Sequence, residues 1–386
     1  MATPTDPMHV RRRSLPAADV VTWLLLGLRV AVLVGVALDV PHFPSSTAGR
    51  FYQIAHTDGV PYRDFPVEYP IGELVVIRAV AAWSLGATRV LIACVAFVSD
   101  IATYSLLRLG RGRDVARRYL ALGAPLLVFI YRRTDLLAVA LAVAGAIAVE
   151  RGREWSGGTL FGAAILAKLW PVVLAPALVV QRRARALWVT IVVVAVGVAT
   201  WVLVGGPDAV RQVVTLRGAD GWELESTVGA VVWPLTGEYR YEQGANRTGA
   251  IPPGAGIALA ALLVVAVGAV WWKARSSADP FGAPALAAVA TMLALSPVLS
   301  PQYLVWLVPW AAIASVDVPR LFRLAAVPVV ITGGIMTLWY LDVAIGRPAN
   351  QTVMIVRNVT LLVVPLAYLA ARPRRVPESS ISEAAG

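Results

Sequence analysis

The sequence predicts an all-α fold: a polytopic integral membrane protein with about twelve transmembrane helices and an interfacial helix in the first external loop. Three observations support this prediction. Of the 386 residues, 58% are hydrophobic and only 15% are charged, unlike the composition of a soluble domain. The apolar residues form long runs, and most of the 34 basic residues lie in short clusters between these runs. The net charge of +11 is therefore not concentrated on a soluble surface, which excludes a nucleic-acid-binding protein.

Thirteen apolar runs are candidates for helices that enter the bilayer, where a complete crossing needs about 20 residues at about 1.5 Å of rise each. They cover residues 20–38, 70–86, 88–108, 119–131, 134–149, 157–169, 171–180, 188–204, 256–272, 282–297, 302–315, 323–341 and 352–370.

The arginine clusters decide which of these runs cross, because short arginine-rich loops stay in the cytoplasm. The cluster at 108–118 should lie on the same side as the cluster at 11–13. It does so only if the run 70–86 does not cross. That run is short and carries Glu73 and Arg78, which favours a helix lying at the membrane surface.

The resulting topology is that of a multi-pass protein of the plasma membrane with both termini in the cytoplasm. We expect a cytoplasmic N-terminus at residues 1–19, a single transmembrane domain over residues 20–371 and a disordered cytoplasmic tail at 372–386. Two large external loops cover residues 39–87 and 205–255.

Three predicted hairpins are too short to reach the external membrane surface, since thirteen helical residues span only about 20 Å. Non-helical backbone at that depth is tolerated where it lines a cavity or is buried in protein. We therefore expect the hairpin tips to converge on one water-accessible pocket that opens outward. The polar residues at these tips are Arg132, Arg133, Asp135, Lys168, Gln302 and Tyr303.

Carboxylates are concentrated in the first external loop, where one of them could act as a general base towards a sugar or lipid hydroxyl. The candidates for this catalytic role are Asp39, Asp64 and Glu68, and Asp58 and Glu73 lie in the same loop. The alternative interpretation is that these are ordinary solvated loop charges.

Basic residues at the hairpin tips suit a phosphate or diphosphate group, because arginine offers a bidentate fork and lysine a point charge. The candidates are Arg132, Arg133 and Lys168, with Arg63 of the first external loop as a further one. Alternatively, the two tip arginines mark a loop end, or Arg133 pairs with Asp135.

The remaining candidates for substrate binding are polar residues of the external loops and hairpin tips, namely Tyr62, Asp135, Glu225, Gln302 and Tyr303. Within the spans, Asp100 is expected to pair with Arg29 or another polar group, since an isolated charge in a bilayer is costly. Gly158 and Gly162 form a GxxxG pattern that would let two helices approach closely.

Metal and disulfide chemistry have little support in the sequence. Cys94 is the single cysteine, which excludes a disulfide framework, and the three histidines form no HExxH pair. The first external loop has no DxD pair. We therefore predict no cofactor and no metal ligands, although a divalent metal is not excluded.

Several segments together resemble one family, the actinobacterial polyprenyl-phosphate-mannose-dependent mannosyltransferase-like proteins of glycosyltransferase family 87, which have the type C glycosyltransferase fold. The similar segments are RFYQIAHTDGVPYRDFPVEYPIGEL (50–74), YRRTDLLAVAL (131–141), LAKLWPVVLAP (166–176), RGADGWELES (217–226) and LSPVLSPQYLVWLVP (295–309).

The resemblance implies an enzyme that moves a sugar, mannose, from a polyprenyl phosphate to a glycolipid or glycan hydroxyl at the external membrane face. An acidic residue in the first external loop would be the base, and a single displacement would invert the configuration. Relatives often carry an aspartate shortly before the pair that corresponds to Arg50 and Phe51, where this chain has residues 45–49 without a carboxylate. Asp39, at the end of the first span, is then the first candidate for the base. The departure leaves an altered acceptor or a loss of activity open.

Two other functions are alternatives to sugar transfer. A transporter or flippase of a lipid-linked or small anionic substrate would share the number of spans and the buried charges, but the chain lacks the repeated halves typical of transporters. An inactive scaffold is the other alternative. The expected partners are the donor lipid, the acceptor and the lipid bilayer.

Overall fold

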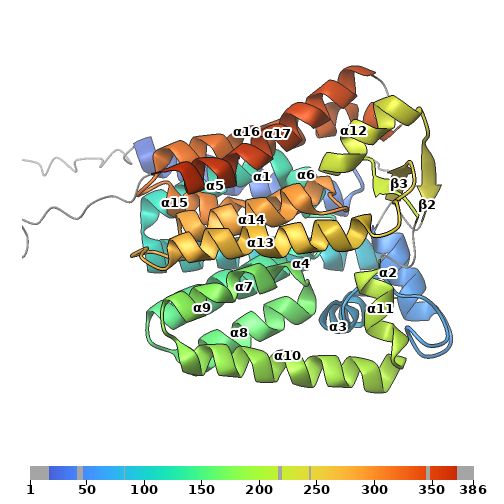
Figure 1. The fold of residues 1–386 in the computed structure, drawn as a ribbon, viewed down its shortest axis with the longest axis horizontal. Helices are drawn as coiled ribbons and strands as arrows, with labels where there is room; N and C mark the ends of the chain where they lie inside the picture. The colour runs from blue at the N-terminus through green and yellow to red at the C-terminus, as the bar shows by residue number, and fades with distance from the viewer. Residues whose placement is uncertain are drawn as a thin grey trace, which may run out of the picture.

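The computed structural model describes residues 17–40, 47–81, 83–215, 220–242, 245–344 and 348–371. These residues are mostly helical, and the long helices lie roughly parallel to one another (Figure 1). The predicted cytoplasmic arginines 11–13 and the predicted disordered tail at 372–386 lie outside the described residues.

Helices cover the predicted apolar runs in order, and three further helices lie in the predicted external loops 39–87 and 205–255. The α-helices are α1 (Ala17–Ala37), α2 (Thr47–His56), α3 (Ile71–Val80), α4 (Leu85–Arg111), α5 (Arg113–Gly123), α6 (Leu127–Ile130), α7 (Asp135–Glu150), α8 (Glu154–Ala167), α9 (Pro176–Val180), α10 (Ala184–Gly205), α11 (Asp208–Val214), α12 (Thr227–Thr236), α13 (Ala255–Ala274), α14 (Ala283–Leu295), α15 (Val308–Ala314), α16 (Pro319–Ala344) and α17 (Pro348–Ala370). Short 3₁₀ helices are η1 (Ala124–Leu126), η2 (Trp170–Leu174) and η4 (Pro301–Trp306).

Within the described residues, five helices are long and apolar enough to cross a membrane. They are Asp19–Ala37, Leu85–Arg111, Ala184–Gly205, Ala255–Ala274 and Gln351–Ala370. The predicted number of about twelve crossings stays a prediction. In contrast, α3 has ten residues and spans only about 15 Å, which is too short to cross.

Prolines break the shorter predicted runs. Pro125, Pro171 and Pro301 each lie at the start of a 3₁₀ helix, and Pro176 begins α9. A proline has no backbone N–H to continue a helix ladder, so these runs proceed as two short helical pieces joined end to end. The helices of the three predicted short hairpins are therefore interrupted close to the hairpin tips.

The predicted loop at 108–118 is wrong in its secondary structure, because α4 continues to Arg111 and α5 begins at Arg113. Gly112, with a φ of 96°, is the single residue between the two helices. Arg111 forms ion pairs with Glu150 at the end of α7 and with Asp279 before α14, 2.8 Å away. These contacts bring several basic loops together at one end of the bundle, which we call the basic end.

The opposite end carries the two large loops predicted to be external, and we call it the loop end. In Figure 1, α2, α11, α12 and the strands gather there. The second of these loops contains a three-stranded antiparallel sheet of β1 (Trp222–Glu223), β3 (Ala245–Thr248) and β2 (Arg240–Glu242), in that order. The all-α prediction is therefore wrong for this segment, whose many glycines and prolines favoured turns.

Close helix packing depends on small residues, as the GxxxG pattern predicted. A Cβ atom on Gly158 would lie 2.4 Å from the carbonyl oxygen of Ala186, and one on Gly162 would lie 2.6 Å from the side chain of Val193. Both contacts are between α8 and α10. The prediction that these two glycines allow a close helix approach is confirmed.

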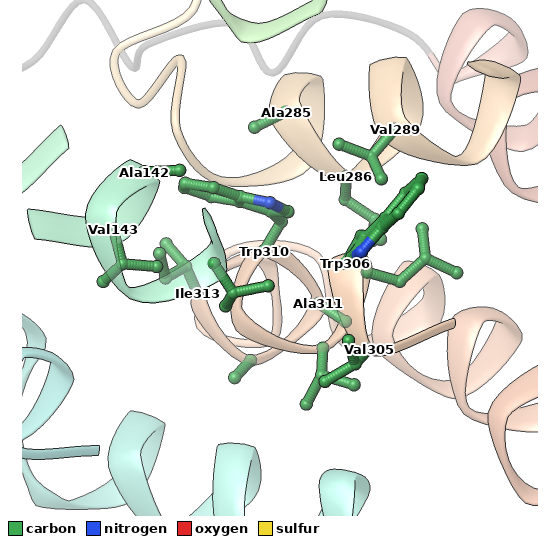
Figure 2. Close-up of a cluster of buried hydrophobic side chains, with 14 of the residues drawn as sticks. Ala142, Val143, Ala285, Leu286, Val289, Val305, Trp306, Trp310, Ala311 and Ile313 are labelled. Atoms are coloured by element: carbon green, nitrogen blue, oxygen red, sulfur yellow. The ribbon is translucent and has the colours of Figure 1, made fainter. Parts of the chain in front are cut away.

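Two indole rings, one turn apart along η4 and α15, lie in the core. Figure 2 shows Trp306 beside Leu286 and Val289 of α14, and the ring centroid of Trp310 lies 6.2 Å from that of Phe281. Trp310 is fully buried, and Trp306 is 7% exposed. Trp306 consequently has a fixed position, which matters for the polar groups that it contacts.

Candidate functional site

A buried polar cluster forms where α3 meets the tips of two predicted hairpins. Lys168, directly after α8, places its Nζ atom 3.4 Å from Oε1 of Glu73 and 4.0 Å from Oδ2 of Asp135. Glu73 is fully buried and Asp135 is 2% exposed. Lys168 therefore serves as the counter-ion of two buried carboxylates from α3 and α7.

A glycine makes this contact possible. A Cβ atom on Gly72 would lie 2.6 Å from the backbone carbonyl of Leu166, so only glycine lets α3 approach the end of α8 this closely. The Thr134 hydroxyl donates a hydrogen bond to Oε1 of Glu73. Burial raises the pKa of Glu73, whereas Lys168 and Thr134 lower it. The second oxygen of this carboxylate, Oε2, has no hydrogen-bond partner among the described residues.

Aromatic rings form one side of the cluster. The indole N–H of Trp306 donates to Oδ1 of Asp135 at 3.0 Å. The Trp306 ring stacks on Tyr303, with 4.2 Å between the ring centroids, and on Trp170, with 5.2 Å between them. Lys168 lies 5.2 Å from the centre of the Tyr69 ring. Asp135, Lys168 and Tyr303 therefore lie close together, as expected, and the water-accessible pocket stays a prediction.

Asp39 lies between two arginines of different helical segments. Its carboxylate oxygens are 2.8 Å from NH1 of Arg89 and 3.3 Å from NH1 of Arg132. Asp39 has a φ of 62°, a left-handed conformation in which its backbone turns away from the end of α1. The neighbouring Arg133 donates a hydrogen bond to the hydroxyl of Thr47, at the start of α2. The first candidate for the base is therefore in direct contact with Arg132, one of the predicted phosphate-binding arginines.

The other two candidate bases are held by arginines within the first external loop. Glu68 accepts hydrogen bonds from Nε and NH2 of Arg50, the shortest at 2.7 Å. Asp64 accepts from Arg63 at 3.0 Å and from the backbone N–H of Val60 at 2.6 Å. These two bonds lower the pKa of Asp64. Asp64 thus stabilises a turn. Arg63 is exposed at the edge of this turn, and none of the contacts described joins it to Arg132 or Arg133.

Tyr62 has a structural position in the same loop. Its hydroxyl donates to the carbonyl of Tyr69 at 2.8 Å, and its ring packs against Trp201. The side-chain amide of Gln212, in α11, donates to the Tyr62 carbonyl and accepts from the backbone N–H of Val67 at 3.4 Å. The two large loops are joined by these bonds, so the second loop fixes the shape of the first.

Glu225 and Gln302 are buried, each with 9% of its surface exposed. The Glu225 carboxylate pairs with Arg357 of α17 at 3.2 Å, and its backbone carbonyl accepts hydrogen bonds from Arg357 and Asn358. Burial raises the pKa of Glu225 to about 8, although Arg357 lowers it. Substrate binding by Glu225 and Gln302 stays a prediction.

The predicted pairing of Asp100 with Arg29 is confirmed. Their side chains are 2.8 Å apart in the centre of the bundle and are almost completely buried. The hydroxyls of Tyr119 and Tyr131 donate to the same carboxylate at 2.6 and 2.8 Å. Asp100 is thus fully satisfied by protein groups, which identifies it as a structural residue.

Sequence reasoning missed the positions of Glu73, Arg89 and Glu223 in this region. Arg89 had a detectable signal, because it is a basic residue at the end of a span where the positive-inside pattern expects none. Glu73 was recognised only as a loop carboxylate. Glu223 is two residues from Glu225, and nothing in the sequence distinguished the two. Within the described ranges, no group of three or more histidine, cysteine, aspartate or glutamate side chains is arranged to hold a metal ion.

The fold and the polar cluster define a helical membrane protein with buried charged groups at the loop end of its bundle. The family model of glycosyltransferase family 87 matches residues 67–301, which is more than half of the chain. The chain therefore belongs to glycosyltransferase family 87 and is a membrane glycosyltransferase. No curated protein matches it.

Proposed function

We propose that this enzyme transfers mannose from a polyprenyl-phosphate donor to a hydroxyl of a glycolipid or glycan at the external membrane face. Membership of family 87 supports sugar transfer over the transporter alternative. The choice of donor, sugar and membrane side rests on the resemblance of the loop segments and on the arginine pattern of the sequence.

One observation carries the mechanism: the Asp39 carboxylate lies within 3.3 Å of Arg132 and 2.8 Å of Arg89. Two guanidinium groups stabilise the ionised form of Asp39, which a general base requires before it can accept a proton. Arg132 is also adjacent in sequence to Arg133. A lipid phosphate that binds these two arginines would therefore have its sugar beside Asp39.

The reaction proposed is a single displacement. The acceptor hydroxyl attacks the anomeric carbon, its proton passes to Asp39, and the bond to the phosphate oxygen breaks with the electron pair leaving on the lipid phosphate. Arg132 and Arg133 stabilise the charge that develops on the leaving phosphate. Arg132 would turn from Asp39 towards the phosphate when the donor binds, while Arg89 keeps Asp39 in place. Attack opposite the leaving group inverts the anomeric configuration.

Lys168 fits phosphate binding less well than the arginines. Its ammonium group is already engaged by Glu73 and Asp135, and a phosphate would add a third negative group to that partly closed cluster. We therefore assign the donor phosphate to Arg132 and Arg133, with Arg89 in support. Asp64 and Glu68 remain the alternative bases.

The experiment measures transfer of radiolabelled mannose from polyprenyl-phosphate-mannose to membrane glycolipids. Asp39→Asn is expected to lower the rate by about 100-fold or more, since a general base contributes about 10²–10⁴-fold. Asp208→Asn is the matched control, because it also replaces a carboxylate paired with an arginine, here an exposed one, and it should keep nearly the wild-type rate. Equal transfer by the wild type and Asp39→Asn would remove Asp39 as the base. Absence of transfer by the wild type would contradict the donor.

A further inference from the structure

Glu223, in strand β1, has a buried carboxylate that is only partly used by the protein. The residue is 5% exposed. Its Oε1 atom accepts a hydrogen bond from the Ser300 hydroxyl at 2.8 Å, and its Oε2 atom has no hydrogen-bond partner among the described residues. A buried carboxylate oxygen without a partner is costly and needs a specific explanation.

The contrast with Glu225 argues against a purely structural explanation. Glu225 is two residues away, and its carboxylate forms an ion pair with Arg357. Glu223 has no such ion pair within the described residues. Burial raises the pKa of Glu223, and the Ser300 hydroxyl, the charge of Arg247 and the backbone of Leu299 lower it. The segment 223–225 thus has one carboxylate in a salt bridge and another with an oxygen available to a ligand.

Tyr303 connects Glu223 with the polar cluster around Lys168. The backbone N–H of Tyr303 donates to the carbonyl of Ser300 at 2.9 Å, and the Ser300 hydroxyl donates to Glu223. On its other side, the Tyr303 ring stacks on Trp306, whose indole N–H donates to Asp135, an ion-pair partner of Lys168. Tyr303 therefore lies between Glu223 and the polar cluster, and Arg133 is two residues from Asp135 in the chain.

The chemistry of these groups suits a sugar. Carboxylate oxygens accept hydrogen bonds from hydroxyl groups, and bonds to a charged acceptor are stronger than neutral ones. Tyr303 is only partly buried, although one face of its ring stacks on Trp306. An aromatic ring beside a carboxylate offers an apolar surface to the C–H groups of a pyranose and an acceptor to its hydroxyls.

We propose that Oε2 of Glu223 accepts a hydrogen bond from a hydroxyl of the donor sugar and so helps to select which sugar is transferred. This inference rests on the proposed function, because a sugar held by its phosphate at Arg133 would extend towards Tyr303 and Glu223. It makes Glu223 a specificity-determining residue, distinct from the proposed base Asp39. A site built around a sugar hydroxyl discriminates against sugars that lack it, since the buried acceptor is then left unpaired.

The experiment compares wild type and Glu223→Gln with polyprenyl-phosphate-mannose and with its 2-, 3-, 4- and 6-deoxy forms as donors. Glutamine has nearly the same shape and keeps an oxygen for the Ser300 hydroxyl, while an amide N–H₂ replaces the free acceptor. In the wild type, one deoxy donor should lose at least about tenfold in kcat/KM, as expected for a hydrogen bond to a charged group. In Glu223→Gln the penalty for that same donor should shrink to within about threefold of the parent donor.

The matched control is Glu238→Gln, in the same external segment, whose exposed carboxylate pairs weakly with Arg240. It should leave the whole deoxy profile unchanged. The inference is overturned if Glu223→Gln keeps the wild-type profile, or if it changes only the KM of the acceptor. The proposed function fails separately if the wild-type enzyme transfers no sugar from any polyprenyl phosphate. Unfolding temperatures equal to the wild type show that the variant is folded.

Discussion

Replacing Lys168 by methionine would leave two buried carboxylates without their counter-ion. Nζ of Lys168 lies 3.4 Å from Glu73 and 4.0 Å from Asp135, and these carboxylate side chains are 1% and 2% exposed. Methionine keeps the length and much of the volume of the lysine stem, so the loss is chiefly that of the charge. The substitution therefore tests whether Lys168 stabilises the contact between α3, α7 and α8.

The expected effect follows from the burial of the partners. Removing one member of a buried ion pair costs about 3–5 kcal/mol, because the remaining charge is left uncompensated. At about 2.1 cal/mol/K of unfolding entropy per residue, a chain of 386 residues has an unfolding entropy of about 0.8 kcal/mol/K. Lys168→Met should therefore lower the unfolding temperature by about 4–6 °C.

The assay is thermal unfolding of the purified protein in detergent, followed by tryptophan fluorescence. The double variant Lys168→Met/Glu73→Gln should recover more than half of the loss, because the closer carboxylate is neutralised as well and Asp135 keeps its bond from Trp306. Arg211→Met is the matched control. Arg211 and Asp208 are 3.9 Å apart and 77% and 79% exposed, so this change should shift the unfolding temperature by less than about 1 °C.

Two results would refute the reasoning. The first is a Lys168→Met variant that unfolds at the wild-type temperature, and the second is a double variant less stable than the single one. The activity of the double variant adds a separate measurement. If its stability recovers but sugar transfer is lost, Lys168 or Glu73 takes part in substrate binding in addition to its structural role.

Two further predictions concern the centre of the bundle. Gly162→Leu should lower stability by about 1–3 kcal/mol in the same thermal assay, because its side chain would overlap Val193, whereas Gly27→Leu, with open space around it, should have little effect. Asp100→Asn should lower stability by about 3–5 kcal/mol, because buried Arg29 loses its counter-ion. An unchanged unfolding temperature in Gly162→Leu would contradict the packing argument, and one in Asp100→Asn would contradict the pairing argument.

The helical architecture was largely predictable, because the length and hydropathy of each apolar run and the positions of the arginines depend only on the local sequence. The long apolar helices occur where the runs predicted them, and α3 is a short helix. The boundary between α4 and α5 was not predictable, since the arginines there suit both a polar loop and the ends of two helices. The small sheet was missed because its strands have only two to four residues.

The candidate site was predictable as a region but only partly in its pairings. Short hairpins implied buried tips, and this placed Lys168 and Asp135 together correctly. In contrast, the contact of Glu73 with Lys168 depends on how closely α3 approaches α8, which Gly72 decides through three-dimensional packing. The contact of Asp39 with Arg89 similarly depends on the rotation of α4 about its axis. A single sequence contains no direct record of such rotations.

The helix α17 follows in the chain the groups that it holds, and it contacts both ends of the molecule. Arg357 and Asn358 bind Glu225 at the loop end, and near the basic end Lys273 of α13 donates hydrogen bonds to the carbonyls of Tyr368 and Leu369. Until α17 has been synthesised and inserted, these earlier groups lack their partners. The segment that carries Glu223 and Glu225 would then reach its final arrangement only after α17 has been made. A chain that stopped soon after residue 301 would contain the whole family match and still lack these contacts.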